Sequence, residues 1–366
     1  MLVKLFQFIF DIGIVPTDWY KTIIHPIPKS LDSDPRIPLN YRGISLVSCM
    51  SKLFTGVLTN RLNDYFEENG IVVDEQGGFR KKRSCNDQAF ILHSLASDAI
   101  QSKASLFGCF IDLKKAFDCV NREMLLYKLL DKGIEGKMYF IIKSLYNAEK
   151  TMASIKINDL LTDWFYTTQG VKQGDSLSPI LFLLFINDLA KALIDSGLGV
   201  EVDGRRVPIL LYADDIVLLS NSEKDLQTMV DVVHEWCSTW LMSVNLAKTK
   251  IVHFRHKRKN RSEFVFKYGE KIIDYVDTYK YLGIYFDQHL DFRLNEEELS
   301  KAGGRALGAL VSKLKQSNCM GYEAFSKCVS CSIYPILDYG SEIVGYVNAP
   351  ATERVENRAA DFSGCS

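Results

Sequence analysis

The sequence lacks any strong bias of charge, since 44 Lys and Arg residues face 45 Asp and Glu residues and the net charge is −1. It also lacks a long polar tract, and 47% of its residues are hydrophobic. Because positive and negative residues are balanced, any nucleic-acid contact must come from local clusters of Lys and Arg. The hydrophobic content excludes a mostly disordered chain. The 366 residues are enough for two or three subdomains that share a core.

Cysteine pairs with the spacing of a small secreted scaffold are also missing. The nine cysteines instead favour reduced thiols in a cytosolic or nuclear protein. Cys328 and Cys331 form a lone C-x-x-C with Cys319 nearby, but a zinc site needs a fourth ligand and none has a suitable spacing. We therefore predict that these cysteines are buried thiols on a helix.

No segment has the pattern of a signal peptide or of a transmembrane helix. The apolar stretch from Met1 to Pro16 is interrupted by Asp11, and no small-residue cleavage pattern follows it, so we predict an amphipathic helix there. The apolar run over 179–194 contains charged residues and is shorter than the roughly 20 apolar residues that a span needs. We expect an intracellular protein, in the nucleus or the cytoplasm, with no membrane partner.

Apolar periodicity and turn residues divide the chain into predicted elements. Five prolines within residues 16–45 favour extended segments and turns. Helical spacing predicts helices over 48–68, 85–102, 118–130, 176–195, 222–241, from 295 onward and over 322–337, and strand patterns cover 107–112, 250–254 and 279–286. Ser222 is a suitable N-cap for its helix. The tail after Ala349 is expected to be poorly ordered.

Two adjacent acids, Asp214 and Asp215, lie at the tip of a predicted hairpin whose arms are the apolar segments 208–212 and 216–219. Two like charges about 4 Å apart repel by about 4 kcal/mol at an effective dielectric near 20, so a positive partner is expected. Two hard divalent cations would serve, and Asp112 at the end of another predicted strand would be a third ligand. For the hairpin alone, a solvated Asp-Asp turn is the alternative.

These acids lie in sequence blocks that resemble those of a known family. Phe110-Ile-Asp-Leu-Lys-Lys-Ala-Phe-Asp118 and Tyr212-Ala-Asp-Asp215 resemble two blocks of reverse transcriptases, specifically those of non-LTR (LINE-type) retrotransposons. Further blocks follow in the family's order: Pro26-Ile-Pro-Lys29, Asn40-Tyr-Arg-Gly-Ile-Ser-Leu46, Gln76-Gly-Gly-Phe-Arg80, Gln169-Gly-Val-Lys-Gln-Gly-Asp-Ser-Leu-Ser-Pro179, Asn245-Leu-Ala-Lys-Thr249 and Tyr281-Leu-Gly283. The likeness covers roughly residues 1 to 345.

The resemblance implies an α+β right-hand polymerase fold. Its parts would be an N-terminal extension and fingers (1–105), a palm with the catalytic acids (106–290, with a fingers contribution around 120–170) and a helical thumb-like region (291–348). The remaining residues, 349–366, would be the poorly ordered tail. The implied activity is that of an RNA-directed DNA polymerase.

The resemblance also implies roles for the residues of the active site. Asp112 and Asp215 would hold two Mg²⁺ ions, for which Mn²⁺ can substitute, Asp214 would hold one, and the carbonyl of Ile111 could help. Lys248 would be the general acid that protonates the pyrophosphate leaving group, a role suited to a buried lysine with a shifted pKa. The alternative for Lys248 is a surface lysine in a basic stretch that contacts phosphates.

Five further residues would form the nucleotide pocket by the same resemblance. Arg80 and Arg83, in the basic run 80–83, would cradle the triphosphate. Phe117 would collide with a ribose 2′-hydroxyl and so select deoxynucleotides, although it could equally be an aromatic core residue. Gln173 and Gly174 would line the nucleotide and template pocket, where Gly allows close approach of the backbone. Their block could also be only a helix start.

The implied partners are an RNA template, a DNA or RNA primer and dNTPs, while the sequence does not define the oligomeric state. Tyr281-Leu-Gly283 resembles the hairpin that holds the primer end, although a buried strand would have the same letters. The endonuclease and cysteine–histidine knuckle of a complete LINE-type element are missing, so we expect no autonomous integration by this chain alone. A maturase-like RNA-binding protein and a catalytically idle retroelement remnant are the alternatives.

Overall fold

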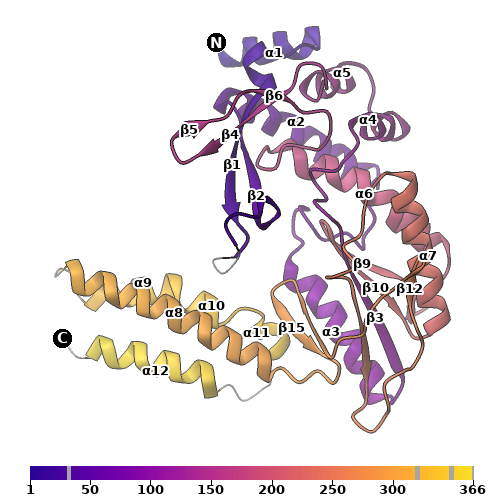
Figure 1. Ribbon diagram of the computed structural model, residues 1–366, viewed down its shortest axis with the longest axis vertical. Helices are drawn as coiled ribbons and strands as arrows, with labels where there is room; N and C mark the ends of the chain where they lie inside the picture. Colours follow the sequence, from indigo (N-terminus) through magenta and orange to yellow (C-terminus); the bar gives the residue numbers. More distant parts are fainter. Residues whose placement is uncertain (31–33, 318–321, 346–349, 365–366) are drawn as a thin grey trace.

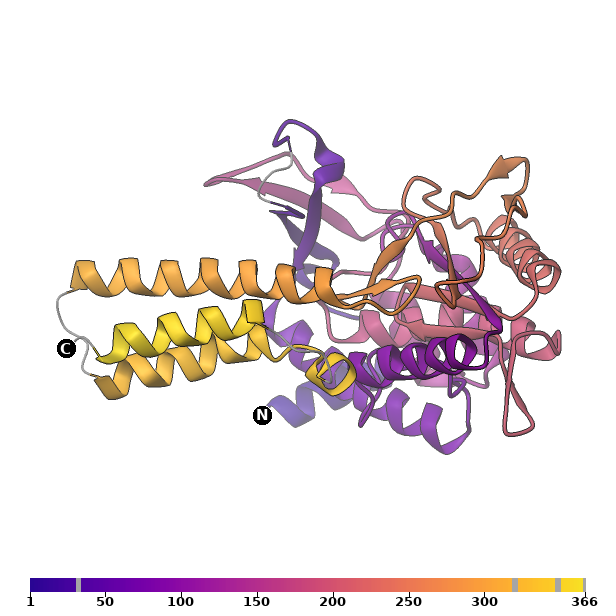
Figure 2. The ribbon, with the colours of Figure 1, turned by 90° about the horizontal axis from the view of Figure 1, so that it is seen from below.

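The computed structural model describes residues 1–30, 34–317, 322–345 and 350–364. It has three parts: an N-terminal sheet with surrounding helices, a central sheet flanked by helices, and a C-terminal helical unit that extends to one side (Figure 1). Figure 2 shows the long axes of this helical unit pointing away from the central sheet. The mixture of helices and sheets agrees with the predicted α+β class.

The N-terminal sheet joins segments that are distant in sequence. Its strands follow the order β2-β1-β4-β5, with β6 also paired to β4, and the β1–β4 pair is parallel. The strands are β1 (Lys21–Pro28), β2 (Tyr41–Leu46), β4 (Met152–Ile157), β5 (Leu160–Leu161) and β6 (Phe165–Tyr166). The helices of this part are α1 (Leu2–Ile12), η1 (Thr17–Tyr20), η2 (Pro38–Asn40), α2 (Cys49–Glu68), α4 (Arg122–Asp131) and α5 (Gly136–Leu145). The proline-rich segment thus forms strands, as predicted.

The central sheet is antiparallel, with the order β11-β3-β10-β9. Its strands are β3 (Ser105–Asp112), β9 (Ile209–Tyr212), β10 (Asp215–Ser220) and β11 (Lys250–Arg255). Every residue of β3 between its two ends is buried. A strand that is covered on both faces forms a continuous apolar run instead of an alternating one, which explains the sequence Leu106 to Ile111.

Alternate residues of β3 pack into two separate cores. Phe107 and Cys109 belong to the main core, together with α6 (Leu177–Asp195) and α7 (Glu223–Thr239). Leu106 and Phe110 belong to a second core with α3 (Cys85–Gln101). The period of two along a strand produces this division, and it leaves Asp112 at the end of a strand that is fixed from both sides.

Helix α6 is the centre of the main core. Among the described residues it is the one helix long and apolar enough to cross a membrane by length and composition, yet 72% of that stretch is buried within the fold. Its polar residues have partners inside the protein, since Asn187 bonds the backbone of Ile71 and Val73 and Asp188 accepts from Lys128. A core helix accounts for this composition.

Helix starts follow their local signals. Ser222 accepts a hydrogen bond from the Asp225 N–H, which confirms it as an N-cap, and Ser84 and Asp87 form a capping box at the start of α3.

The prediction of one strand over 279–286 is wrong. This segment is a hairpin of β14 (Thr278–Tyr281) and β15 (Ile284–Asp287), because Gly283 adopts a φ of 88° and lets the chain reverse. Two further hairpins are β7 (Val200–Val202) with β8 (Arg205–Val207), and β12 (Lys267–Tyr268) with β13 (Lys271–Ile272).

The C-terminal helical unit has a small core of its own. Its helices are α8 (Arg293–Ser317), α9 (Tyr322–Ser332), α10 (Tyr334–Leu337) and α12 (Pro350–Gly364), and α11 (Ser341–Val344) connects the unit to α3. The prediction of a poorly ordered tail is corrected for residues 350–364, because Val355 and Ala359 of α12 are buried in this core.

Cys328 and Cys331 lie on α9, but Cys331 is exposed and Cys328 only half-buried, so their predicted burial is wrong. Cys319 lies outside the described residues.

Candidate active site

The β9–β10 hairpin and the end of β3 bring three carboxylates together. Asp215 opens β10 and lies opposite Tyr212 of β9 on one side and Asp112 of β3 on the other. Ala213 and Asp214 form the turn between the two strands. Residues directly opposite in an antiparallel pair have Cβ atoms about 5 Å apart on the same face of the sheet. The structure therefore places Asp112 and Asp215 side by side at one edge, with Asp214 next to them.

The turn that carries these acids is held in an unusual conformation by Gln76. Ala213 has a φ of 57°, in the left-handed region that residues with a Cβ rarely adopt. The buried Gln76 amide accepts from the Ala213 N–H (2.9 Å) and donates to the Ala213 carbonyl (3.3 Å). A Cβ at Gly78 would lie 2.2 Å from the Ala213 nitrogen. The Gln76-Gly-Gly block is thus explained by its contact with this turn, a role that the sequence did not reveal.

The acids repel one another, and Arg42 provides an opposing charge. Burial raises the pKa of Asp214, and the charge of Asp112 raises it further. Burial followed by the charges of Asp214 and Asp112 raises the pKa of Asp215 to about 6. The positive charge of Arg42 in β2 lowers the pKa values of both Asp214 and Asp215. The N-terminal sheet therefore presents a cation to the carboxylates, and their remaining repulsion favours a positively charged ligand.

The donor set suits Mg²⁺ bound in part by its substrate. Among the described residues, no group of three or more His, Cys, Asp or Glu side chains is arranged as a ready-made metal cage. Magnesium is commonly held by one or two carboxylates together with waters and substrate phosphates, and dedicated protein cages are rare for it. Three adjacent aspartates, two of them with raised pKa values, fit such an open site. The Ile111 carbonyl as a further ligand stays a prediction.

Replacing Asp215 with Asn is expected to stabilise the metal-free protein at neutral pH. Since the folded-state pKa of Asp215 is about 6, above that of an unfolded aspartate, the ionisation of Asp215 destabilises the fold as pH rises from about 4 to about 6. Asp215 is partly exposed, so screening limits the gain to about 1 kcal/mol. Urea unfolding in EDTA at about pH 4 and about pH 7.5 measures this difference. If Asp215→Asn changed the free energy of unfolding by the same amount at both pH values, the predicted destabilisation by ionised Asp215 would be contradicted.

Asp112 is held by the Asn245-Leu-Ala-Lys-Thr249 block. The side-chain amide of Asn245 donates to the Asp112 carboxylate (2.9 Å), and the backbone N–H of Asn245 donates to the Asp112 carbonyl (2.7 Å). The hydroxyl of Thr249 accepts a hydrogen bond from the Asp112 N–H (3.2 Å). Lys248 was the one residue of this block with a predicted role in the site. Lys248 is exposed, which agrees with the alternative of a surface lysine. Its role as general acid stays a prediction.

Three residues of the basic run 80–83, namely Arg80, Lys81 and Arg83, form ion pairs with neighbouring acids. Arg80 makes a two-bond ion pair with Glu67 of α2 and also donates to the Val73 carbonyl. With 10% of its side chain exposed, Arg80 holds this loop against α2 and has few donors left for a triphosphate. Its predicted contact with the triphosphate stays a prediction. Arg83 is more exposed and pairs with Asp74, so its predicted contact with the nucleotide stays a prediction.

Phe117 occupies a position between core and solvent. Its half-buried ring stacks on Phe182 of α6, with ring centres 4.5 Å apart, and meets Phe79 edge-on at 6.3 Å. It lies five residues after Asp112 on the turn that follows β3. The packing on Phe182 would hold the ring in place beside the site, so the core and selection roles are compatible. Sugar selection by Phe117 stays a prediction.

Gln173 and Gly174 connect the start of α6 to the N-terminal sheet. The Gln173 carbonyl accepts from the Ser45 N–H of β2 (2.7 Å). Gly174 has a φ of 114°, and a Cβ there would lie 3.0 Å from the Ser45 carbonyl oxygen, so the contact requires glycine. The next residue, Asp175, is buried and accepts from the Thr55 hydroxyl. The block therefore starts a helix and also fixes β2, which carries Arg42, relative to the carboxylates.

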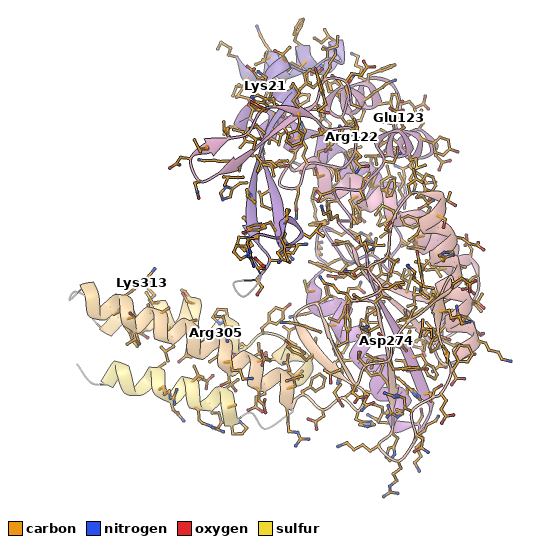
Figure 3. All side chains as sticks on the ribbon, in the orientation of Figure 1. Lys21, Arg122, Glu123, Asp274, Arg305 and Lys313 are labelled. Carbon is orange, nitrogen blue, oxygen red and sulfur yellow. The ribbon has the colours of Figure 1, made fainter. Side chains whose placement is uncertain are left out.

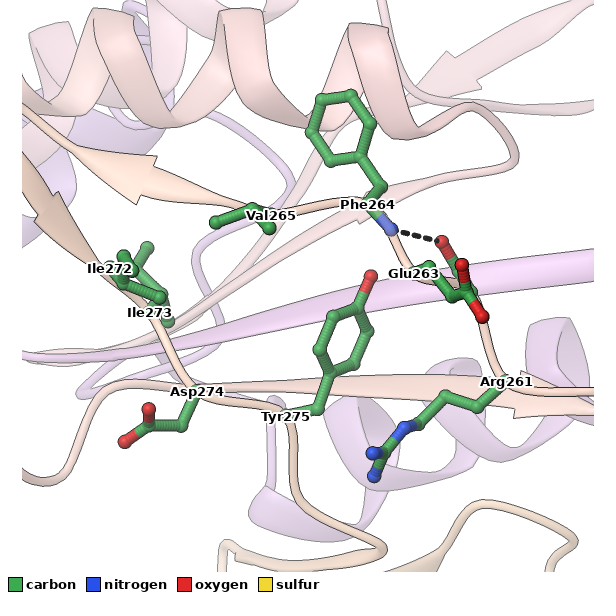
Figure 4. Close-up of a pocket in the computed structure, with 9 residues that line it drawn as sticks. Arg261, Glu263, Phe264, Val265, Ile272, Ile273, Asp274 and Tyr275 are labelled. Atoms are coloured by element: carbon green, nitrogen blue, oxygen red, sulfur yellow. Dashed lines mark hydrogen bonds between the residues drawn. The ribbon is translucent and has the colours of Figure 1, made fainter.

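An open pocket elsewhere on the central part does not belong to this site. It lies between the segments 261–265 and 272–275, and the Tyr275 side chain points into it between Arg261 and Phe264 (Figure 4). None of the three aspartates lines it. The carboxylates instead lie at an edge of the sheet, where Asp215 is exposed and Asp112 and Asp214 are half-buried.

Comparison with known families agrees with this arrangement. The sequence profile of the reverse transcriptase (RNA-dependent DNA polymerase) family matches residues 27–286, more than half of the chain. The chain belongs to the reverse transcriptase family, as its sequence blocks predicted. The match includes the central sheet and all three aspartates, and it enters the N-terminal sheet at Ile27, near the end of β1.

The similar proteins are polymerases of mobile elements. The chain is 28% identical to the probable RNA-directed DNA polymerase from transposon BS of Drosophila melanogaster over 98% of its length, and 27% identical to that of the mobile element jockey of Drosophila funebris over 94%. It is also 28% identical, over 75% of its length, to a Pol polyprotein from retrotransposable element R2 of Popillia japonica. The chain spans only 40%, 37% and 38% of these relatives.

Solved structures of telomerase from Candida tropicalis share the fold. The apo enzyme aligns with a TM-score of 0.54 at 13% identity, covering 99% of this chain and 62% of that one. The complex with a TWJ fragment of telomeric RNA aligns with a TM-score of 0.54 at 15% identity, covering all of this chain and 58% of that one. At this level of identity the likeness shows the fold alone.

Proposed function

We propose that this chain is the RNA-directed DNA polymerase domain of a non-LTR retrotransposon, which adds dNTPs to a primer 3′-hydroxyl by two-metal phosphoryl transfer. The observation that carries the proposal is the register of Asp215 against Asp112, with Asp214 in the adjacent turn. Membership of the reverse transcriptase family supports RNA as the template. The relatives named for RNA-directed DNA polymerases of mobile elements support the type of element.

The three parts of the fold would then be fingers, palm and thumb. The N-terminal sheet and its helices would be the fingers, the central sheet would be the palm, and the C-terminal helical unit would be the thumb. Arg305 and Lys313 are exposed on α8 and would contact the phosphates of the template–primer duplex (Figure 3). The partners are thus an RNA template, a DNA or RNA primer and dNTPs.

The carboxylates would act by holding metal ions and positioning the reacting groups. Two Mg²⁺ ions, or Mn²⁺ in their place, would be held by Asp112 and Asp215, with Asp214 bound to one, and would neutralise charge on the attacking and leaving oxygens. Asn245 keeps the Asp112 carboxylate oriented, and Gln76 keeps the turn that carries Asp214 in place. Preorganised charge and position supply the catalysis in such reactions. Lys248 would donate a proton to the leaving pyrophosphate from its exposed position.

Arg42 would bind the incoming triphosphate. Its charge lowers the pKa values of Asp214 and Asp215, so it lies close to the acids. Arg42→Ala should raise the KM for dNTP by about 10- to 100-fold, since a hydrogen bond to a charged group contributes roughly 1.5 to 3 kcal/mol. Steady-state kinetics on a fixed template–primer measure this. Arg36→Ala, at an exposed arginine paired with Asp34, is the control and should leave KM unchanged. A KM that changes in Arg80→Ala but not in Arg42→Ala would sink the assignment.

The proposal is tested by extending a labelled primer on RNA templates that differ in one templating base. Purified protein in Mg²⁺ should add the complementary dNTP on each template, and Asp215→Asn should not. Binding of the RNA without extension, by a protein that is folded, would favour an idle remnant or a maturase-like RNA-binding protein.

A further inference from the structure

The turn between β14 and β15 lies beside the carboxylates. Tyr279 of β14 stacks on Phe110 with ring centres 4.3 Å apart, two residues before Asp112 in β3. Burial, followed by the charges of Asp112 and Asp215, raises the pKa of Tyr279 to about 12. The pKa of Tyr281 is also raised by burial and by Asp215. The residues that follow Tyr281 therefore form a turn next to the site where the primer end would lie.

This turn has a backbone conformation that needs support. Leu282 has a φ of 46° and Gly283 a φ of 88°, so two successive residues are in the left-handed region. A residue with a Cβ, such as Leu282, is disfavoured there by contact with its own carbonyl group. Such a conformation persists only where surrounding structure fixes it.

The support comes from Tyr339, which belongs to the segment between α10 and α11. Its hydroxyl donates to the Leu282 carbonyl at 2.7 Å. Its ring also fills the space beside Gly283, where a Cβ would lie 2.7 Å from the Tyr339 Cε1 atom. The next residue, Gly340, approaches Ile284 of β15 equally closely, since a Cβ at Gly340 would lie 2.7 Å from Ile284 Cδ1. Residues 339 and 340 thus pack tightly against this turn and the strand that follows it.

A second contact fixes Tyr339 relative to the central sheet. Asn86, in the first turn of α3, donates to Glu342 of α11 at 3.3 Å, and Ile343 is buried in the core that α3 shares with the sheet. The segment 339–343 therefore touches the turn, α3 and the helical unit together. A displacement of the helical unit would be transmitted to Leu282 and Gly283.

We propose that Tyr339 is a positioning residue for primer binding: it couples the C-terminal helical unit to the turn at Leu282 and Gly283, and so sets the place of the primer end. This inference rests on the proposed polymerase function. Tyr339 acts through the turn and does not touch the reacting atoms. Its loss therefore affects how firmly the template–primer is held, and leaves the chemical step unchanged once the primer end is in place.

Tyr339→Phe removes only the hydroxyl and keeps the ring against Gly283. We expect KM for the template–primer to rise by about three- to tenfold, as for one lost hydrogen bond. The number of nucleotides added per binding event should fall, while kcat at saturating template–primer stays within about twofold and the melting temperature is unchanged. Tyr334→Phe, at another exposed tyrosine of the helical unit, is the matched control and should behave as wild type.

The outcomes separate this inference from the function on which it rests. If wild type extends primers but Tyr339→Phe has unchanged KM and processivity, the inference is wrong and the polymerase proposal stands. A fall in kcat with unchanged KM would also overturn it. If wild type extends no primer on any template, the proposed function fails and the inference fails with it.

Discussion

Asp112→Asn should lower the rate of nucleotide addition by about a thousandfold or more, a loss as large as the one expected for Asp215→Asn. The substitution keeps the size of the side chain but removes one of the charges that would hold both metal ions. Asn245 and Thr249 bond the backbone of Asp112 as well as its side chain, so the end of β3 should keep its place. Single-turnover addition of one dNTP to a preformed template–primer measures the loss.

An aspartate in a different hairpin provides the control for this loss. Asp203 lies in the exposed turn between β7 and β8 with a φ of 48°, a conformation that Asn also tolerates. Asp203→Asn should therefore keep the wild-type rate. If Asp112→Asn retained more than about a tenth of the rate, Asp112 would not be a metal ligand in the reaction.

Phe117→Ala should weaken discrimination against ribonucleotides by at least about tenfold. The Phe117 ring is fixed by its stack on Phe182 and lies just after Asp112, where it would meet the 2′-hydroxyl of a bound nucleotide. Removing the ring removes that collision. The ratio of kcat/KM for dATP to kcat/KM for ATP on the same template–primer measures the effect.

Two comparisons decide whether the Phe117 ring itself selects the sugar. Phe117→Tyr retains the ring and should retain the selection, whereas Phe117→Ala should lose it. If Phe117→Ala lowered activity with both sugars equally, Phe117 would be a core residue that supports α6, and selection would have to come from another side chain.

The central site was predictable from the sequence because its signals are local. The apolar arms around Asp214 and Asp215 define a hairpin, and the apolar run before Asp112 defines a central strand. Strand pairing then needs no further information to bring the acids together. The caps at Ser84 and Ser222 follow from short-range hydrogen bonds in the same way.

The ion pair of Arg80 and the position of Arg42 were not predictable, because they depend on contacts between distant elements. Arg80 is neutralised by Glu67, which α2 supplies from the other side of a loop. Arg42 gains its place because the contact of Ser45 with Gln173 fixes β2 near the carboxylates. A basic residue in a motif has the same letter whether its charge is free or paired, and only packing decides between the two.

The order of the tail was missed, and the exposure of Lys248 was left open between two alternatives, for related reasons. Nothing in the sequence near Lys248 states which side of the Asn245–Thr249 segment faces solvent. The tail has few large apolar residues, and its helix depends on burying Val355 and Ala359 against a core that other helices form. Tertiary contacts of this kind override the local pattern.

The most direct test of the account is the rate at which purified wild-type protein adds one complementary dNTP to a primer annealed to RNA in the presence of Mg²⁺. The account predicts that the templating base dictates the added nucleotide, that EDTA stops the reaction and that Asp215→Asn reduces the rate by about a thousandfold. Template-directed addition by Asp215→Asn at the wild-type rate, or no addition by folded wild type in either Mg²⁺ or Mn²⁺, would contradict it.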